Sequence, residues 1–203
     1  MTLPNKLTML RILLIPVMIV LWYIPQLDKV ILSINPEGFF YGLTLKMLLM
    51  FIIFVVASIT DFLDGHIARS RNLITSFGKF ADPLADKMLV FSAMVFIMLD
   101  TNYGSWYSHI MPAWAFIIMI VREFMVSGIR MVVAQKGVVI PAAKLGKWKT
   151  FITMVAIIVL FFCHLHIVIA IIGMVLMYIA CILTVISGIE YFINSKSVIL
   201  ESI

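Results

Sequence analysis

Long runs of hydrophobic residues alternate with short polar segments along the chain. The runs cover residues 12–24, 41–60, 88–99, 113–133, 150–162 and 167–193. A helix needs about 20 mostly apolar residues to cross the hydrocarbon core of a bilayer. The shorter runs are flanked by residues with helical spacing, which can extend them to this length. The six runs therefore predict an all-α protein with six transmembrane helices joined by short loops.

The polar segments predict where these helices begin and end. Residues 4–11 mix polar and apolar residues at helical spacing, which indicates an interfacial N-terminal helix before the first span. Helix-breaking residues such as Pro25 and Pro36 predict a loop over residues 25–40. The second span is expected to continue as a helix over 61–71, and Ser76 can cap the next helix, which runs through Leu99. Within that helix Pro83 predicts a kink and not a break, because membrane helices tolerate proline.

Composition places the chain in a membrane. Hydrophobic residues make up 64% of it, charged residues only 12%, and the mean hydropathy is +1.15. Soluble domains contain about 45–50% apolar residues. Residues 1–203 are therefore expected to form one membrane-embedded domain, without a separate soluble domain. Cys163 and Cys181 fall in apolar stretches and are expected to be small buried hydrophobic residues, not disulfide or metal partners.

Positive charge is unevenly distributed between the two sides of the membrane that the six predicted spans define. Lys29 and Lys46 fall on one side, and Arg122 falls inside the fourth span. The other twelve of the fifteen cations fall on the opposite side: Lys6, Arg11, Arg69, Arg71, Lys79, Lys87, Arg130, Lys136, Lys144, Lys147, Lys149 and Lys196. Cytoplasmic loops carry the excess of Lys and Arg. Both termini are therefore expected in the cytoplasm of a multi-pass plasma-membrane protein.

Four aspartates gather on this cytoplasmic side. Asp61 and Asp64 lie about 60° apart around one helix, and Asp82 and Asp86 follow each other at i+4 on the next helix. Two facing helices would bring the four carboxylates together, and their repulsion would favour a divalent cation between them. Oxygen ligands select Mg²⁺ or Mn²⁺, and such sites commonly complete their shell with substrate phosphate. The alternative is a set of helix caps and ion pairs with the nearby cations Arg69, Arg71, Lys79 and Lys87.

The segment around these aspartates resembles the signature of the CDP-alcohol phosphotransferase family. Eight residues match it at fixed spacings: Asp61, Asp64, Gly65, Ala68, Arg69, Gly78, Asp82 and Asp86. The resemblance implies a membrane enzyme, often dimeric, that cleaves the pyrophosphate of a CDP-linked lipid, releases CMP and joins the phosphatidyl group to an alcohol. It implies that Asp61, Asp64 and Asp82 bind the metal, as two ions, and that Asp86 is the catalytic base and a further candidate ligand. It also implies that Gly65, Ala68, Arg69 and Gly78 contact CDP-diacylglycerol.

Patterns outside the signature are similar to the branch of this family whose acceptor is glycerol 3-phosphate. They are Pro4-Asn5-x-Leu7-Thr8-x2-Arg11, Arg122-Glu123 with Ser127-Gly128-x-Arg130, Gly146-Lys147-x-Lys149-Thr150, and Ser187-Gly188-Ile189-Glu190-Tyr191. Because this acceptor is an anion, its phosphate is expected to bind cytoplasmic cations. The candidates are Arg122, Lys147, Lys149, Arg130 and Lys144. Arg122 is the most informative of them, because charge within a span is costly and often functional.

The residues leave other functions open. Carboxylates in a membrane also occur along ion pathways, so a metal-ion transporter is the main rival. Against it, all four aspartates lie at one cytoplasmic end, and the first, fifth and sixth spans provide no matching acid. Within the enzyme class, serine, inositol phosphate or phosphatidylglycerol are alternative acceptors. The expected partners are CDP-diacylglycerol, glycerol 3-phosphate, membrane phospholipids and a second copy of the chain, with no nucleic acid.

Overall fold

The computed structural model describes residues 3–33, 42–70, 76–100, 110–135 and 144–200. Within these ranges, the side chains of residues 3–4, 33, 62–70, 76–80, 132, 134–135, 144 and 197–200 lie outside the described part. The described chain is almost entirely helical. It divides into two compact units, residues 1–104 with 161–169 and residues 105–160 with 170–203.

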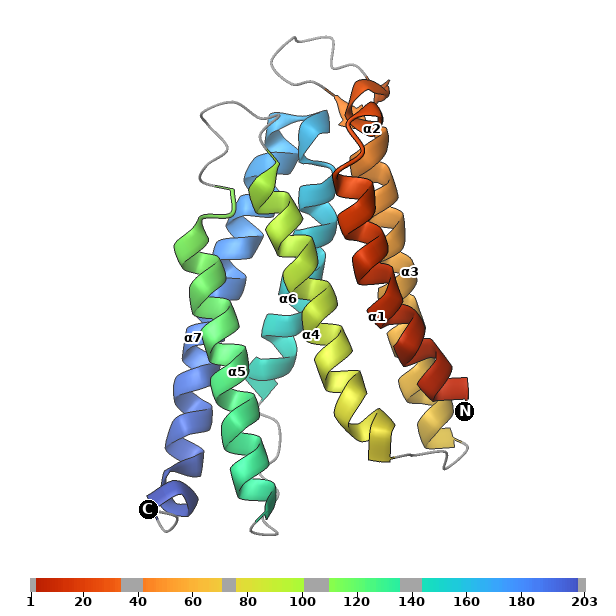
Figure 1. The fold of residues 1–203 in the computed structure, drawn as a ribbon. Helices are drawn as coiled ribbons and strands as arrows, with labels where there is room; N and C mark the ends of the chain where they lie inside the picture. Colours follow the sequence, from red (N-terminus) through yellow and green to blue (C-terminus); the bar gives the residue numbers. More distant parts are fainter. Residues whose placement is uncertain (1–2, 34–41, 71–75, 101–109, 136–143, 201–203) are drawn as a thin grey trace. The chain divides into compact units, whose positions relative to one another are not determined.

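Three long helices build the first unit: α1 (Leu3–Trp22), α3 (Leu45–Ser70) and α4 (Ser76–Leu99). Helix α1 contacts both of the others, and the three lie side by side in Figure 1. Their fully buried side chains include Met18, Met50, Phe54 and Met94. Buried alanines on α3 and α4 bring little bulk to this core, and small residues let membrane helices approach closely.

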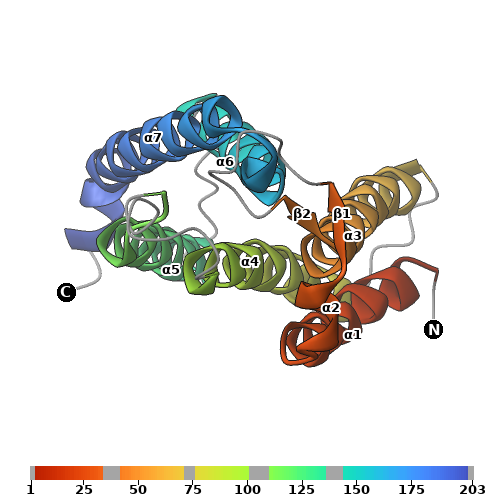
Figure 2. The same ribbon diagram turned by 90° about the horizontal axis from the view of Figure 1, so that it is seen from above.

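A small hairpin covers one end of this unit. Helix α2 (Gln26–Lys29) is followed by β1 (Ile31–Ser33), which pairs antiparallel with β2 (Leu43–Thr44) beside the start of α3 (Figure 2). Buried Lys46 forms an ion pair with Asp28 and lies 4.8 Å from the ring centroid of Trp22. The sequence predicted a loop over 25–40, and the described part of that segment contains this short helix and strand instead.

The second unit contains α5 (Ala113–Gln135), α6 (Lys144–Phe161) and α7 (Ile167–Leu200), with the first residues of α7 assigned to the first unit. A short 3₁₀ turn, η2 (Cys163–Leu165), lies between α6 and α7. Two helices are longer than predicted. Helix α6 begins at Lys144, before the expected start of the fifth span, and α7 continues past residue 193 through part of the expected polar tail.

The six long helices occur where the hydrophobic pattern predicted six spans. Helix α1 runs through both the expected interfacial segment and the first span, and α4 is a single helix with Pro83 inside it. The predicted turn at 72–75 lies outside the described residues. By length and hydropathy, two helices of the described chain qualify as membrane spans, over Asn5–Trp22 and Ile167–Lys196. The structure is therefore consistent with an all-α membrane protein.

Candidate active site

One face of α1 carries the partners of three predicted site aspartates. Thr8 and Arg11 are three residues apart and therefore lie on neighbouring positions of one helical face. The Thr8 hydroxyl donates a hydrogen bond to Asp82 on α4. The Arg11 Nη1 atom lies 2.8 Å from a carboxylate oxygen of Asp61 on α3, and it also donates to Asp86 on α4. Helix α1 thus connects the two acid-bearing helices.

Burial and charge are distributed unequally in this cluster. The Arg11 side chain is 0% exposed, whereas the Asp61 and Asp86 side chains are 43% and 42% exposed. The guanidinium therefore lies below the carboxylates, which remain accessible from the other side. The Arg11 guanidinium pairs with two of the three carboxylates, Asp61 and Asp86, whereas Asp82 accepts from the uncharged Thr8 hydroxyl. A buried arginine is stabilised only when it is paired, and the two aspartates supply that pairing.

The donor set fits a divalent cation in its chemistry. The carboxylates supply oxygen ligands only, and the side chains of Asp61 and Asp86 are partly exposed. No group of three or more His, Cys, Asp or Glu among the described side chains is arranged to hold a metal ion. Asp64, which is also a predicted ligand, lies outside the described side chains.

Five of the predicted site residues fall where side chains are not described. Asp64, Gly65, Ala68 and Arg69 belong to the last turns of α3, and Gly78 belongs to the first turn of α4. Their helical positions agree with the predicted pattern, and their contacts remain predictions.

Sequence reasoning assigned no site role to Thr8 and Arg11. Both were noted in the pattern near the start of the chain, and Arg11 was counted only as a cytoplasmic charge. A signal was available, because Arg11 directly precedes an apolar run and a cation entering a span needs an acidic partner. The sequence did not identify Asp61 and Asp86 as those partners.

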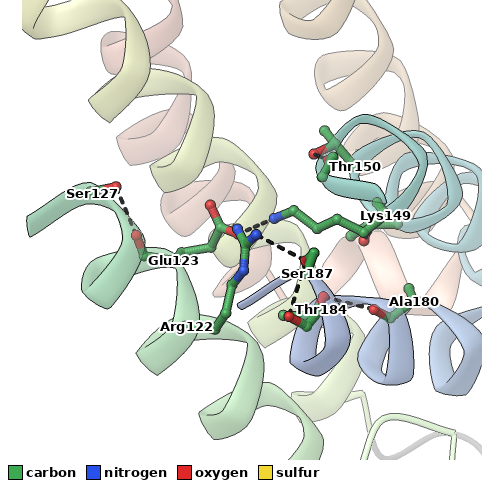
Figure 3. A network of polar contacts seen from close by, with 10 residues as sticks. Arg122, Glu123, Ser127, Lys149, Thr150, Ala180, Thr184 and Ser187 are labelled. Carbon is green, nitrogen blue, oxygen red and sulfur yellow. Dashed lines mark hydrogen bonds and ion pairs between the residues drawn. The ribbon is translucent and has the colours of Figure 1, made fainter. Parts of the chain in front are cut away.

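A second polar cluster lies in the other unit, around Arg122 on α5 (Figure 3). Its Nη1 atom donates to Glu123 Oε1 at 2.8 Å, and its Nη2 atom donates to the Ser187 hydroxyl of α7 at 2.9 Å. Lys149 of α6 donates to the same Glu123 oxygen and is only 9% exposed. Side chains from three helices therefore hold two cations around one carboxylate. The sequence did not predict that Glu123 would pair with Arg122, its neighbour in the chain.

Two of the other predicted acceptor cations, Lys147 and Arg130, have different neighbours. Lys147 is exposed and, two residues before Lys149, points about 200° away around α6. With Trp148 and Phe151 it lines a shallow surface depression of about 280 Å³. The Arg130 guanidinium lies 6.0 Å from the ring centroid of Tyr191, and the side chain of Lys144 is outside the described part. Of the five cations, the structure brings together Arg122 and Lys149.

Comparison with known proteins places these residues in a recognised context. Residues 1–186 match the family model described as CDP-alcohol phosphatidyltransferase. A Bacillus subtilis protein named CDP-diacylglycerol--glycerol-3-phosphate 3-phosphatidyltransferase is 39% identical over 192 residues, covering 94% of this chain and 93% of the relative. A Haemophilus influenzae protein of the same name is 35% identical and covers 98% of this chain and 96% of the relative. A Mycobacterium tuberculosis protein, named probable phosphatidylglycerophosphate synthase, is 34% identical over 93% of this chain and 79% of the relative.

Proposed function

The chain belongs to the CDP-alcohol phosphatidyltransferase family, and we propose that it transfers the phosphatidyl group of CDP-diacylglycerol to sn-glycerol 3-phosphate, releasing CMP. The names of the relatives that match along nearly the whole chain support this reaction and this acceptor. The structural observation that carries the proposal is the convergence of Asp61, Asp82 and Asp86 on one face of α1. The family match also sets aside the metal-ion transporter as a rival.

Asp61, Asp64 and Asp82, with Asp86 as a further candidate, would hold two divalent cations, Mg²⁺ or Mn²⁺. When bound, the cations would neutralise negative charge on the pyrophosphate and stabilise the charge that develops at the reacting phosphorus. Gly65, Ala68, Arg69 and Gly78 are proposed to contact the CDP-diacylglycerol head group. Their small size at three positions would leave room for a bulky ligand beside the helices.

The transfer itself needs a base for the acceptor hydroxyl. We assign this role to Asp86, which would accept the proton as the hydroxyl oxygen bonds to the phosphorus linked to diacylglycerol. The pyrophosphate bond then breaks and CMP leaves. Arg11, buried against Asp86 and Asp61, would hold these carboxylates in place on α4 and α3. Thr8 would fix Asp82 in the same way.

The acceptor phosphate is proposed to bind the Arg122 and Lys149 pair. The planar guanidinium of an arginine can donate two hydrogen bonds to phosphate oxygens, and a phosphate is a strong acceptor for both cations. Glu123 balances part of their charge and holds both side chains in position. Arg130 and Lys144 remain proposed contributors to the same phosphate site, whereas the predicted role of Lys147 is not proposed again because its side chain points away from Lys149.

Replacing Arg122 with Ala should raise the KM for glycerol 3-phosphate by about tenfold or more, because a lost charge-assisted hydrogen bond costs about 1.5–3 kcal/mol. The KM for CDP-diacylglycerol should change much less. Initial rates of CMP release with each substrate varied in turn would measure both. Lys196→Ala, an exposed cation on α7, is the matched control and should leave both constants unchanged. An equal rise for both substrates would instead place Arg122 on the shared pyrophosphate.

An acceptor screen tests the proposed function as a whole. Purified protein would receive CDP-diacylglycerol and Mg²⁺, and CMP release would be compared for glycerol 3-phosphate, serine, inositol phosphate and phosphatidylglycerol. Glycerol 3-phosphate should support the fastest release. Faster release with any of the others would overturn the acceptor assignment, although the family assignment would remain.

The orientation in the membrane is a further part of the proposal. The charge distribution supports cytoplasmic termini, with both polar clusters opening to the cytoplasm of a plasma-membrane protein, and we also propose a single domain that acts as a homodimer. After replacement of Cys163 and Cys181, a cysteine placed at position 104 should react with an impermeant thiol reagent in intact cells. A cysteine at position 75 or 140 should react only after lysis, and labelling of position 75 from outside would reverse the orientation.

A further inference from the structure

The absence of a side chain at Gly188 shapes the Arg122 cluster. Gly188 follows Ser187 on α7, and a Cβ atom added there would lie 2.9 Å from the Cγ of Arg122, 3.6 Å from its Nε and 3.9 Å from its Cδ. A Cβ contact below 3.0 Å does not occur in ordinary packing, so one of the two groups would have to move. The nearest atom belongs to the first part of the arginine chain, so no movement confined to the guanidinium would relieve the contact.

The position of Arg122 is set from three directions. Glu123 accepts from Nη1, Ser187 accepts from Nη2, and Gly188 lies directly beneath the aliphatic part of the side chain. Ser187 is itself held, because its hydroxyl also donates to the Thr184 carbonyl at 3.1 Å within α7. A shift of the arginine chain away from α7 would lengthen the hydrogen bond to Ser187, one of the two that fix the guanidinium.

We propose that Gly188 is a positioning residue for acceptor binding, because it lets Arg122 lie directly against α7 with its guanidinium fixed between Glu123 and Ser187. This inference rests on the proposed function, in which Arg122 binds the acceptor phosphate. A glycine in the middle of a helix is otherwise unfavourable relative to alanine. The close approach of Arg122 gives a reason for its presence.

The chain offers two matched glycine controls in the same unit. A Cβ atom at Gly128, on α5 with Arg122, would meet nothing within 4 Å. A Cβ atom at Gly173 of α7 would lie 2.5 Å from the side chain of Leu160, in an apolar contact without any charged group. Gly128→Ala therefore reports the effect of alanine on a helix alone, and Gly173→Ala reports tight packing alone.

The test compares these three alanine variants by substrate kinetics. Gly188→Ala should raise the KM for glycerol 3-phosphate by about threefold to tenfold and leave the KM for CDP-diacylglycerol within about twofold. Gly128→Ala should change neither KM, and Gly173→Ala should lower the melting temperature without a selective effect on the acceptor. The proposal is overturned if Gly188→Ala behaves like either control while Arg122→Ala does raise the KM for glycerol 3-phosphate.

A double-mutant cycle with Arg122→Ala separates this inference from the proposed function. Once Arg122 is truncated, the Cγ atom that collides with the new Cβ is gone. In the Arg122→Ala background, Gly188→Ala should therefore cause no further rise in the KM for glycerol 3-phosphate. It should also leave the melting temperature unchanged there, although it lowers the melting temperature of the unsubstituted protein. Additive effects would overturn the inference. If the thermal coupling is present but Arg122→Ala leaves the acceptor KM unchanged, Gly188 does position Arg122, and it is the phosphate-site assignment of the proposed function that fails.

Discussion

Alanine at Asp61, Asp64 or Asp82 should abolish CMP release, and the activity of the unchanged protein should depend strictly on a divalent cation. The physical reason is that these carboxylates are proposed to hold the ion that neutralises the pyrophosphate. Without it, charge at the reacting phosphorus would remain uncompensated in a partly buried site. A direct measurement would combine the activity assay with a Mn²⁺-binding assay in which electron paramagnetic resonance detects the bound ion. Asp61→Ala should lose both.

Stability is the main alternative explanation for such a loss, because Asp61 also pairs with buried Arg11. Asp28→Ala is a matched control, since Asp28 pairs with buried Lys46 in the same unit, away from the signature. It should lower thermal stability in a similar way and retain Mn²⁺ binding and turnover. Substantial CMP release by Asp61→Ala in excess chelator would contradict the metal assignment.

Asp86→Asn should lower turnover by about a hundredfold or more, the usual range for loss of a general base. An asparagine keeps the shape of the side chain and can still accept a hydrogen bond from Arg11, but it cannot take a proton from the acceptor hydroxyl. CDP-diacylglycerol binding should therefore be largely retained. Equilibrium binding of the nucleotide lipid, measured beside kcat, would separate the two effects.

Comparing the nucleotide-lipid binding of Asp86→Asn with that of Asp61→Ala decides whether Asp86 acts as a base or as a metal ligand. If Asp86→Asn loses nucleotide-lipid binding to the same extent as Asp61→Ala, then Asp86 acts as a fourth metal ligand. The i+4 spacing from Asp82 makes this outcome physically reasonable. Retained binding with lost turnover would support the assignment as base.

The helices and the acidic stripe could be predicted from the sequence because both depend on local spacing. Apolar runs gave the long helices, Ser76 gave the start of α4, and the intervals between the aspartates placed them on adjacent helices. The partner that joins these helices could not be predicted in the same way. Whether Arg11 meets Asp61 and Asp86 depends on how α1 packs against α3 and α4, which no local pattern specifies.

Two polar residues near helix ends are more buried than the sequence suggested. Residues 194–203 were interpreted as a polar tail, but α7 continues to Leu200, with Ser195 buried and its hydroxyl donating to the Tyr191 carbonyl. Lys149 was interpreted as a cytoplasmic cation for the acceptor phosphate, and the structure shows it buried and paired with Glu123. The Ser195 hydroxyl is thus satisfied within its own helix, and the Lys149 ammonium by a contact between helices that no local pattern specifies.

Coupled transfer of glycerol 3-phosphate into lipid tests the central claim most directly. Purified protein would be incubated with CDP-diacylglycerol, Mg²⁺ and radiolabelled glycerol 3-phosphate, and label in the organic phase would be compared with CMP released. The account predicts equal amounts of the two, with neither formed in excess chelator or by Asp61→Ala. Release of CMP without label in the lipid, or label transfer that persists in chelator, would contradict it.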